Sequence, residues 1–173
     1  MVLRRYSNYL GRRARLDEAI LEKLVTSPIG VMYTLHLAPR IDRVVIPRTH
    51  GKFSSLGANR VGMLTTTGAK SGDERVNPVG LIEFDGTLLA VGSNYGRPVH
   101  PSWSANLIAH PDCEVEFRGP RAPYHAELLT GQDREQTWET VVDYFAGFAR
   151  YAERCAPRQI RLFRLTPAGT AST

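Results

Sequence analysis

The segment from Arg75 to Gly92 constrains the fold most, because it has the pattern of a β-hairpin. Residues 75–84 and 87–92 are rich in strand-forming side chains, and Asp85-Gly86 lies between them. An Asp-Gly pair favours the two-residue type I′ turn that joins antiparallel strands. Pro78 cannot donate to a strand ladder, so it is expected at an edge or a bulge. The segment therefore predicts an antiparallel sheet.

The rest of the chain repeats this pattern, with helices inserted between the hairpins. Further strands are predicted at 61–66, 113–117, 124–129 and 159–165. Helices are predicted at 16–25, at 101–109, and from a capping-box-like start at Thr130 and Asp133 through Trp138, Val141, Val142, Phe145 and Phe148. This order lacks alternating βαβ units. It favours an α+β fold, a small antiparallel barrel with attached helices.

Residues 1–50 differ from the remainder of the chain. Arginines are interleaved with tyrosine and leucine up to residue 15, and apolar residues recur at helical spacing from Leu16 to Val25. We expect a basic amphipathic helix and a connection in 1–50, followed by one barrel domain at 51–173. The helix either packs on the domain with its arginines in solvent or makes peripheral contact with an acidic membrane; both alternatives stay open.

Charge and composition restrict the partners. The net charge is +5 and the sequence pI about 9.5, which favours an anionic partner. A nucleic acid is not expected, because no recognition element accompanies the charge. Two cysteines without motif spacing indicate a reducing, cytoplasmic setting, with the inner face of the membrane as the peripheral alternative. Paired carboxylates, a hydrolytic triad and metal-ligand spacing are not evident, so no metal is expected.

An anion-binding turn is predicted between Thr65 and Arg75. Gly68 and Gly72 permit conformations in which main-chain N–H groups point at an anion. Lys70 and Arg75 supply charge, and hydroxyl side chains supply further donors. The spacing is not that of a Walker A loop. A polar hairpin turn with solvated charges is the alternative, and the residues alone leave the two evenly matched.

Two further clusters are candidates for a ligand pocket. The first runs from Gly92 to Gly96 and continues through His100 and Trp103 to Asn106, where glycines, a polar turn and a flat indole suit a planar ligand with polar edges. The alternative is that Trp103 anchors the core. The second is Phe145, Phe148 and Tyr151, which the spacing of three places near one helix face. Such a stripe is more often core, although the Tyr151 hydroxyl is able to bond a substrate.

The runs LTTTGAKSGDERVNP, VGSNYG and HPSWSANL, with the aromatic residues after Trp138, resemble the deazaflavin-dependent nitroreductase family. The resemblance extends essentially without gaps from about Leu64 to Tyr151, and more loosely to Leu165. It implies a split β-barrel that binds coenzyme F420, an 8-hydroxy-5-deazaflavin with a phosphate and a glutamate tail. It also implies hydride transfer from the reduced coenzyme to a small electron-poor acceptor such as a quinone, nitroaromatic or enone.

The resemblance also assigns residues. It places the phosphate and tail at Ala69, Lys70, Ser71, Arg75, Val76, Asn77, Pro78, Val79 and Gly80. It places the deazaflavin ring at Val91, Gly92, Ser93, Asn94, Ser102, Trp103, Ser104, Ala105 and Asn106, with Phe148 nearby. Ser93, beside the ring, and Tyr151, as a donor to the acceptor, are the implied catalytic residues. An FMN-binding split-barrel reductase and a non-catalytic deazaflavin-binding protein are the alternatives, and the oligomeric state is open.

The chain departs from the family pattern at several positions. Ala69 stands where a basic residue is common, so tail binding is expected to depend on Lys70 and Arg75. Asn94 stands where a lysine is often found. Phe145 and Phe148 replace tyrosines of the member that activates nitroimidazoles, so quinone or enone reduction is as well supported as nitro reduction.

Overall fold

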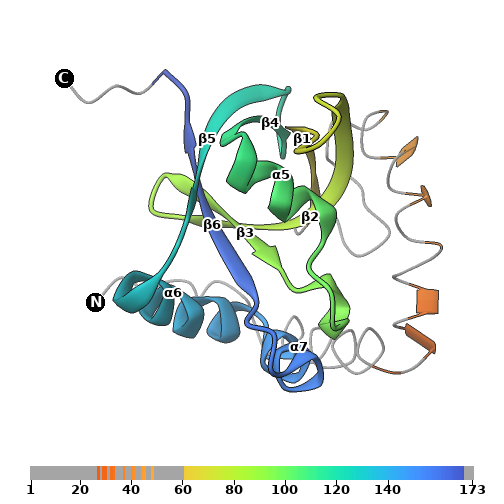
Figure 1. The fold of residues 1–173 in the computed structure, drawn as a ribbon, viewed down its shortest axis with the longest axis vertical. Coiled ribbons are helices and arrows are strands. Elements are labelled where there is room, and N and C mark those ends of the chain that lie inside the picture. The colour runs from red at the N-terminus through yellow and green to blue at the C-terminus, as the bar shows by residue number, and fades with distance from the viewer. Residues whose placement is uncertain are drawn as a thin grey trace.

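The computed structural model describes residues 61–169 and scattered positions between Ser27 and Arg48. The helix expected at 16–25 and the domain boundary expected near residue 50 lie outside the described residues. Residues 61–169 form one closed six-stranded barrel with three α-helices (Figure 1). None of the described helices is long and apolar enough to cross a bilayer.

The barrel contains only antiparallel pairs. Its strands are β1 (Val61–Thr67), β2 (Glu74–Phe84), β3 (Thr87–Gly92), β4 (Asp112–Glu116), β5 (Ala122–Leu128) and β6 (Arg161–Pro167), in the order β1-β2-β3-β6-β5-β4. Pairing of β1 with β4 closes the barrel. The predicted antiparallel barrel is confirmed, and closure removes the exposed sheet edges that an open sheet would leave.

The local predictions for the β2–β3 hairpin are also confirmed. Asp85 and Gly86 have φ of 48° and 74°, and two residues with positive φ are what a type I′ turn requires. Pro78 pairs with Met63 of β1, whereas pairing with β3 begins only at Leu81. The chain at Pro78 therefore has a strand on one side only, which suits a residue without an N–H group.

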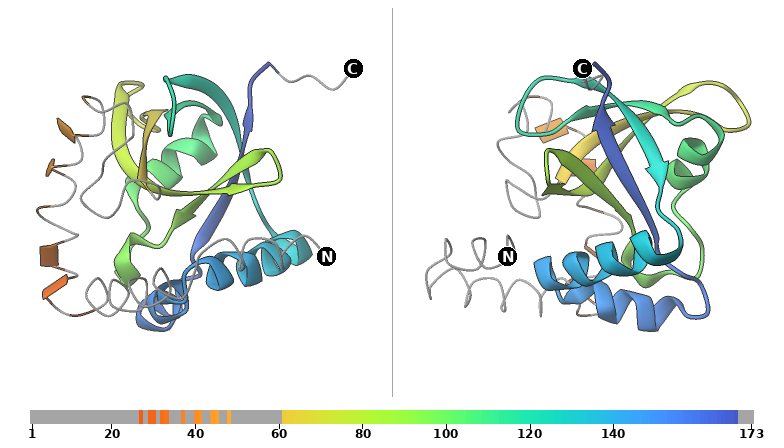
Figure 2. Two further views of the ribbon diagram at one scale, coloured as in Figure 1. Left: turned by 180° about the vertical axis from the view of Figure 1, so that it is seen from behind. Right: turned by 90° about the vertical axis from the view of Figure 1, so that its left-hand side faces the viewer.

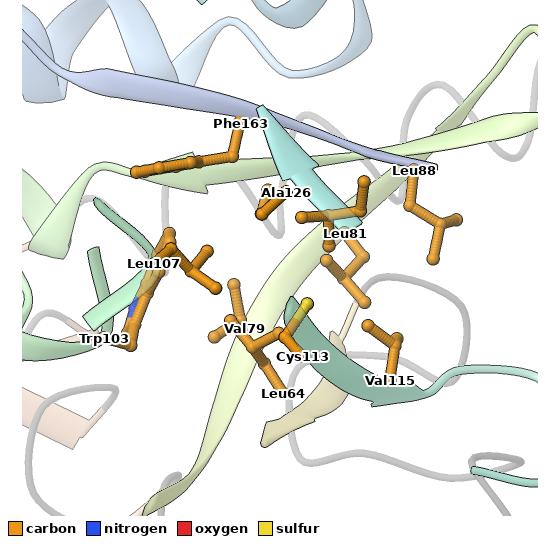
Figure 3. Close-up of a cluster of buried hydrophobic side chains, with 12 residues drawn as sticks. Leu64, Val79, Leu81, Leu88, Trp103, Leu107, Cys113, Val115, Ala126 and Phe163 are labelled. Atoms are coloured by element: carbon orange, nitrogen blue, oxygen red, sulfur yellow. The ribbon is translucent and has the colours of Figure 1, made fainter. Parts of the chain in front are cut away.

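One core fills the barrel. Leu64, Leu81 and Phe163 are at most 1% exposed, and they meet side chains of α5 (Ser102–Ala109), which covers the barrel wall (Figure 3). Trp103 of α5 points into this core, with its ring centroid 5.8 Å from that of Phe163. Burial of these large side chains is the main stabilising contribution to the barrel.

A second core lies at one end of the barrel, under α6 (Gly131–Tyr144) and α7 (Gly147–Cys155) (Figures 1 and 2). Val141 and Tyr151 pack there against strand residues such as Leu162. Helix α7 also packs against the loop after β3, and α5 contacts β1.

The single helix predicted to run from Thr130 through Phe148 is wrong. Phe145 is extended, with φ −152° and ψ 104°, and ends α6. A Cβ at Gly147 would lie 2.3 Å from the Phe145 ring, so the chain turns back on itself where this glycine leaves room. Phe145 therefore does not share a helix with Phe148 and Tyr151. Thr130 occupies the N-cap position as predicted, but its side chain makes no capping hydrogen bond.

Candidate functional site

The turn between β1 and β2 uses most of its main-chain donors internally. Gly68 N donates to Asp73 O and Gly72 N donates to Gly68 O, both at 2.8 Å. Asp73 N donates to Ser71 Oγ at 3.3 Å. Of the amides in the turn proper, those of Lys70 and Ser71 alone have no acceptor among the described residues. The cradle of amides expected from the two glycines is therefore small, and any anion site here depends on side chains.

The side chains of the turn do suit an anion. Lys70 and Arg75 are both exposed. Arg75 Nη2 lies 2.9 Å from Asp73 Oδ2, and the two side chains are 55% and 63% exposed. An ion pair so open to solvent contributes about 1 kcal/mol or less. A phosphate is able to compete for Arg75 at this low cost, so the residues present fit a phosphorylated ligand.

Asn106 of α5 ties this turn to the barrel. Its Oδ1 accepts from Ala69 N at 3.0 Å, and its Nδ2 donates to Thr66 Oγ1 at 3.0 Å. The side chain is buried, with 8% of the residue exposed. Asn106 thus links the segment assigned to the coenzyme tail with the helix assigned to the ring.

We expect Asn106→Leu to lower the free energy of unfolding by about 2 kcal/mol, because the Ala69 amide and the Thr66 hydroxyl each lose a partner. Urea denaturation measures this, and Gln136→Leu, an exposed change on α6, is the control with an expected effect within about 0.5 kcal/mol. An Asn106→Leu variant as stable as the control would contradict the role of this amide as a tie.

The loop after β3 is strained. It continues through the 3-10 turn η1 (Asn94–Gly96), in which Asn94 and Tyr95 have φ of 46° and 54°. Left-handed backbone at two successive residues other than glycine is uncommon and costly, and such strain is concentrated at functional sites. The Asn94 side chain donates to Val99 O at 2.9 Å. The loop assigned to the ring is therefore held in one particular conformation.

Helix α5 presents only part of its assigned residues to a ligand. Trp103 is 7% exposed and lies in the barrel core, and Ser104 is fully buried, where it donates to Pro101 O at 2.8 Å. Ser102 and Ala105 are exposed. Of all the assigned residues, those that are exposed or half-buried are Ala69, Lys70, Ser71, Arg75, Val76, Asn77, Pro78, Gly80, Ser93, Asn94, Ser102, Ala105 and Phe148. Val79, Val91, Gly92, Trp103, Ser104, Asn106 and Tyr151 are buried.

A row of aromatic rings connects α7 with the strained loop. Edge-to-face contacts join Tyr95 to Tyr151 at 6.2 Å, Tyr151 to Phe148 at 6.3 Å, and Phe148 to Phe145 at 5.4 Å between centroids. Tyr151 is 2% exposed. The cluster from Gly92 to Asn106 and the cluster of Phe145, Phe148 and Tyr151 therefore meet through Tyr95, a member of the first cluster to which the sequence assigned no role of its own. No local signal could have shown it, because the contact depends on the break between α6 and α7.

Two titratable groups near these segments are held neutral. Burial lowers the pKa of His100, and the charges of Arg161 and Arg158 lower that pKa further. Burial raises the pKa of the Cys113 thiol to about 12, with smaller contributions from Asp112 and Glu114. His100 is therefore a neutral hydrogen-bonding group near pH 7, and Cys113 is a packed thiol, not a nucleophile. No group of candidate metal ligands occurs among the residues that the structure describes.

Comparison with known proteins identifies the family of the chain. The family model described as F420H(2)-dependent quinone reductase matches residues 40–167. The solved structure of an F420-H2 dependent reductase, FDR-A, is 34% identical over 61% of this chain and 93% of that chain, with a TM-score of 0.56. A structure described as a domain-swapped dimer is 30% identical over 80% of this chain and 99% of that chain, with a TM-score of 0.58. With its barrel and most of its length matched, the chain belongs to the F420H(2)-dependent quinone reductase family.

Proposed function

We propose that this chain is an oxidoreductase that uses coenzyme F420 to reduce a small electron-poor acceptor, with quinones as the first class to test. The family match carries the proposal, and the geometry is consistent with it: Asn106 joins the cationic β1–β2 turn to α5. When bound, the reduced coenzyme supplies a hydride. The protein's part is to bind and orient the two reactants.

In this proposal each segment has a separate task. The side chains of Lys70 and Arg75 bind the phosphate and tail, and the Ala69 side chain adds no charge. The ring lies against the loop from Gly92 to Asn94 and the exposed residues of α5. Packing around Gly92 is tight, since a Cβ there would lie 3.1 Å from Arg161 O.

Ser93 and Tyr151 are the proposed catalytic residues, and they differ in access. Ser93 is half-buried in the loop, whereas Tyr151 is buried beside Tyr95 and Phe148. The phenol is a donor whose removal leaves the ring in place, so it can be tested without disturbing the aromatic row.

We expect Tyr151→Phe to lower kcat with a quinone about tenfold, the size of one hydrogen bond to the acceptor, and to leave the dissociation constant of the coenzyme within about twofold. Steady-state kinetics and fluorescence titration measure the two quantities. Tyr124→Phe, on β5, is the matched control and should change neither. A Tyr151→Phe variant with unchanged kcat would assign Tyr151 to packing alone.

Titration of the purified protein with oxidised F420, followed by absorbance and fluorescence, tests the function directly. We expect a dissociation constant below about 100 μM, which is about −5.5 kcal/mol, and oxidation of the reduced coenzyme on addition of quinone. Binding without turnover on quinones, nitroaromatics and enones would favour a non-catalytic binding protein. Yellow purified protein that does not bind F420 would favour the FMN alternative.

Two proposals about partners of the chain accompany this function. The similarity to a domain-swapped dimer makes a dimer of this chain worth testing by size-exclusion chromatography with light scattering.

The second proposal is peripheral contact of residues 1–15 with acidic lipid, in an otherwise cytoplasmic protein. Liposome flotation before and after deletion of these residues tests it. Equal partition of the two forms would contradict the membrane contact.

A further inference from the structure

Arg158, between α7 and β6, converges on the strained loop after β3. Its Nη2 donates to Ser93 O at 2.7 Å, its Nη1 to Gly92 O at 3.2 Å, and its Nε to Arg97 O at 3.0 Å. Nη1 also lies 3.4 Å from His100 Nδ1, which accepts, since a guanidinium only donates. No ion pair links Arg158 to an acidic side chain within the described part of the chain. Its guanidinium N–H groups instead donate to carbonyl groups at the beginning and at the end of the loop from Gly92 to Arg97.

These bonds hold a conformation that the loop would not prefer alone. Asn94 and Tyr95 are both left-handed, and each such residue costs about 1 kcal/mol or more. Arg154 adds a longer contact, Nη1 to Tyr95 O at 3.4 Å. A Cβ at Gly96 would lie 3.0 Å from Tyr151 O, so α7 also fits closely against the turn. The strain therefore persists because the surroundings, Arg158 first among them, determine the backbone.

Arg158 also sets the direction of one amide. In a trans peptide the C=O and N–H groups point in opposite directions. The Ser93 carbonyl points at Arg158, so the Asn94 N–H in the same peptide points away from it. The amides of Ser93, Gly96 and Arg97 are used inside the loop, as donors to Val91, Ser93 and Asn94 respectively. The Asn94 amide has no acceptor among the described residues and lies in the segment assigned to the ring.

We propose that Arg158 is a positioning residue for coenzyme binding: it holds the loop from Gly92 to Arg97 in its strained form and aims the Asn94 amide at the bound ring. The inference rests on the proposed function and adds to it a residue that lies outside every sequence run assigned to coenzyme binding. Lysine at this position would keep the charge but lose the planar fork that bonds several carbonyls at once.

The test compares Arg158→Lys with Arg134→Lys. Arg134 is a suitable control because it is also half-buried and donates to a main-chain carbonyl, that of Ile160 at 3.1 Å, outside the loop. The first readout is hydrogen exchange of the Ser93, Gly96 and Arg97 amides in coenzyme-free protein. The second is the dissociation constant of oxidised F420 from fluorescence titration.

We expect Arg158→Lys to speed exchange of the loop amides about tenfold and to raise the dissociation constant about tenfold, which is about 1.4 kcal/mol, while Arg134→Lys changes neither. If Arg158→Lys does not fold, Arg158→Gln provides the same comparison with a neutral donor. If the wild-type chain binds F420 and Arg158→Lys binds it with the same dissociation constant, the role of Arg158 is overturned and the proposed function is not. If Arg134→Lys raises the dissociation constant of F420 as much as Arg158→Lys does, the role of Arg158 is overturned as well. Failure of the wild-type chain to bind F420 would overturn the proposed function, and with it this role.

Discussion

Replacing Phe163 with alanine is expected to lower the free energy of unfolding by about 3–5 kcal/mol. Phe163 is 1% exposed and comes from β6, which pairs with β3 on one side and β5 on the other. Its ring contacts Trp103 of α5 inside the barrel (Figure 3). A closed barrel leaves the wall little freedom to collapse into the space, so both lost burial and a residual cavity contribute.

Urea denaturation followed by tryptophan fluorescence measures this loss. Ile108→Ala is the matched control, because Ile108 lies on α5 but is 50% exposed, and it should cost less than about 1 kcal/mol. A loss of less than about 1.5 kcal/mol for Phe163→Ala would mean that the barrel repacks around the missing ring.

The features predicted correctly are those that depend on local backbone chemistry. Asp85-Gly86 supplies two positive φ angles wherever it occurs, and Pro78 lacks an N–H in any context. Strand order depends instead on contacts between distant segments. The pairing of β1 with β4 and of β3 with β6 closes the barrel, and no residue in either pair marks its partner.

The break between α6 and α7 shows why helical periodicity was insufficient. The apolar spacing continues through Phe145, yet the chain turns there because the Phe145 ring occupies the space over Gly147. The turn brings Tyr151 against Tyr95. The helical spacing of apolar residues holds within α6 and within α7, but tertiary packing interrupts the helix between them.

The candidate site was predictable where a side chain carries the chemistry. Lys70 and Arg75 are recognisable from the sequence, because their side chains are charged whatever the backbone conformation. Asn106 was singled out for ring binding, but its side chain bonds the main chain of Ala69, and that contact has no sequence signal. Arg158 was missed for the same reason: its acceptors are mostly carbonyl groups, which every residue has.

Removing both charges of the β1–β2 turn, with Lys70→Gln and Arg75→Gln together, is expected to raise the dissociation constant of F420 about thirtyfold, or about 2 kcal/mol. A hydrogen bond to a charged group contributes about 1.5–3 kcal/mol, and solvent exposure of both side chains reduces that to about 1 kcal/mol each. Stability should hardly change, since the Arg75–Asp73 pair is itself exposed.

Salt dependence separates this charge effect from a distorted turn. The screening length falls from about 10 Å at 0.1 M salt to about 3 Å at 1 M, so the wild-type protein should bind more weakly as salt rises. The double variant should lose most of that dependence. Arg164→Gln removes a cation of β6 that is paired with Glu127 of β5, and neither strand neighbours β1 or β2. This control should keep both the affinity and the salt response. If the double variant binds F420 weakly but with an undiminished salt response, other cations bind the tail and the assignment to this turn is wrong.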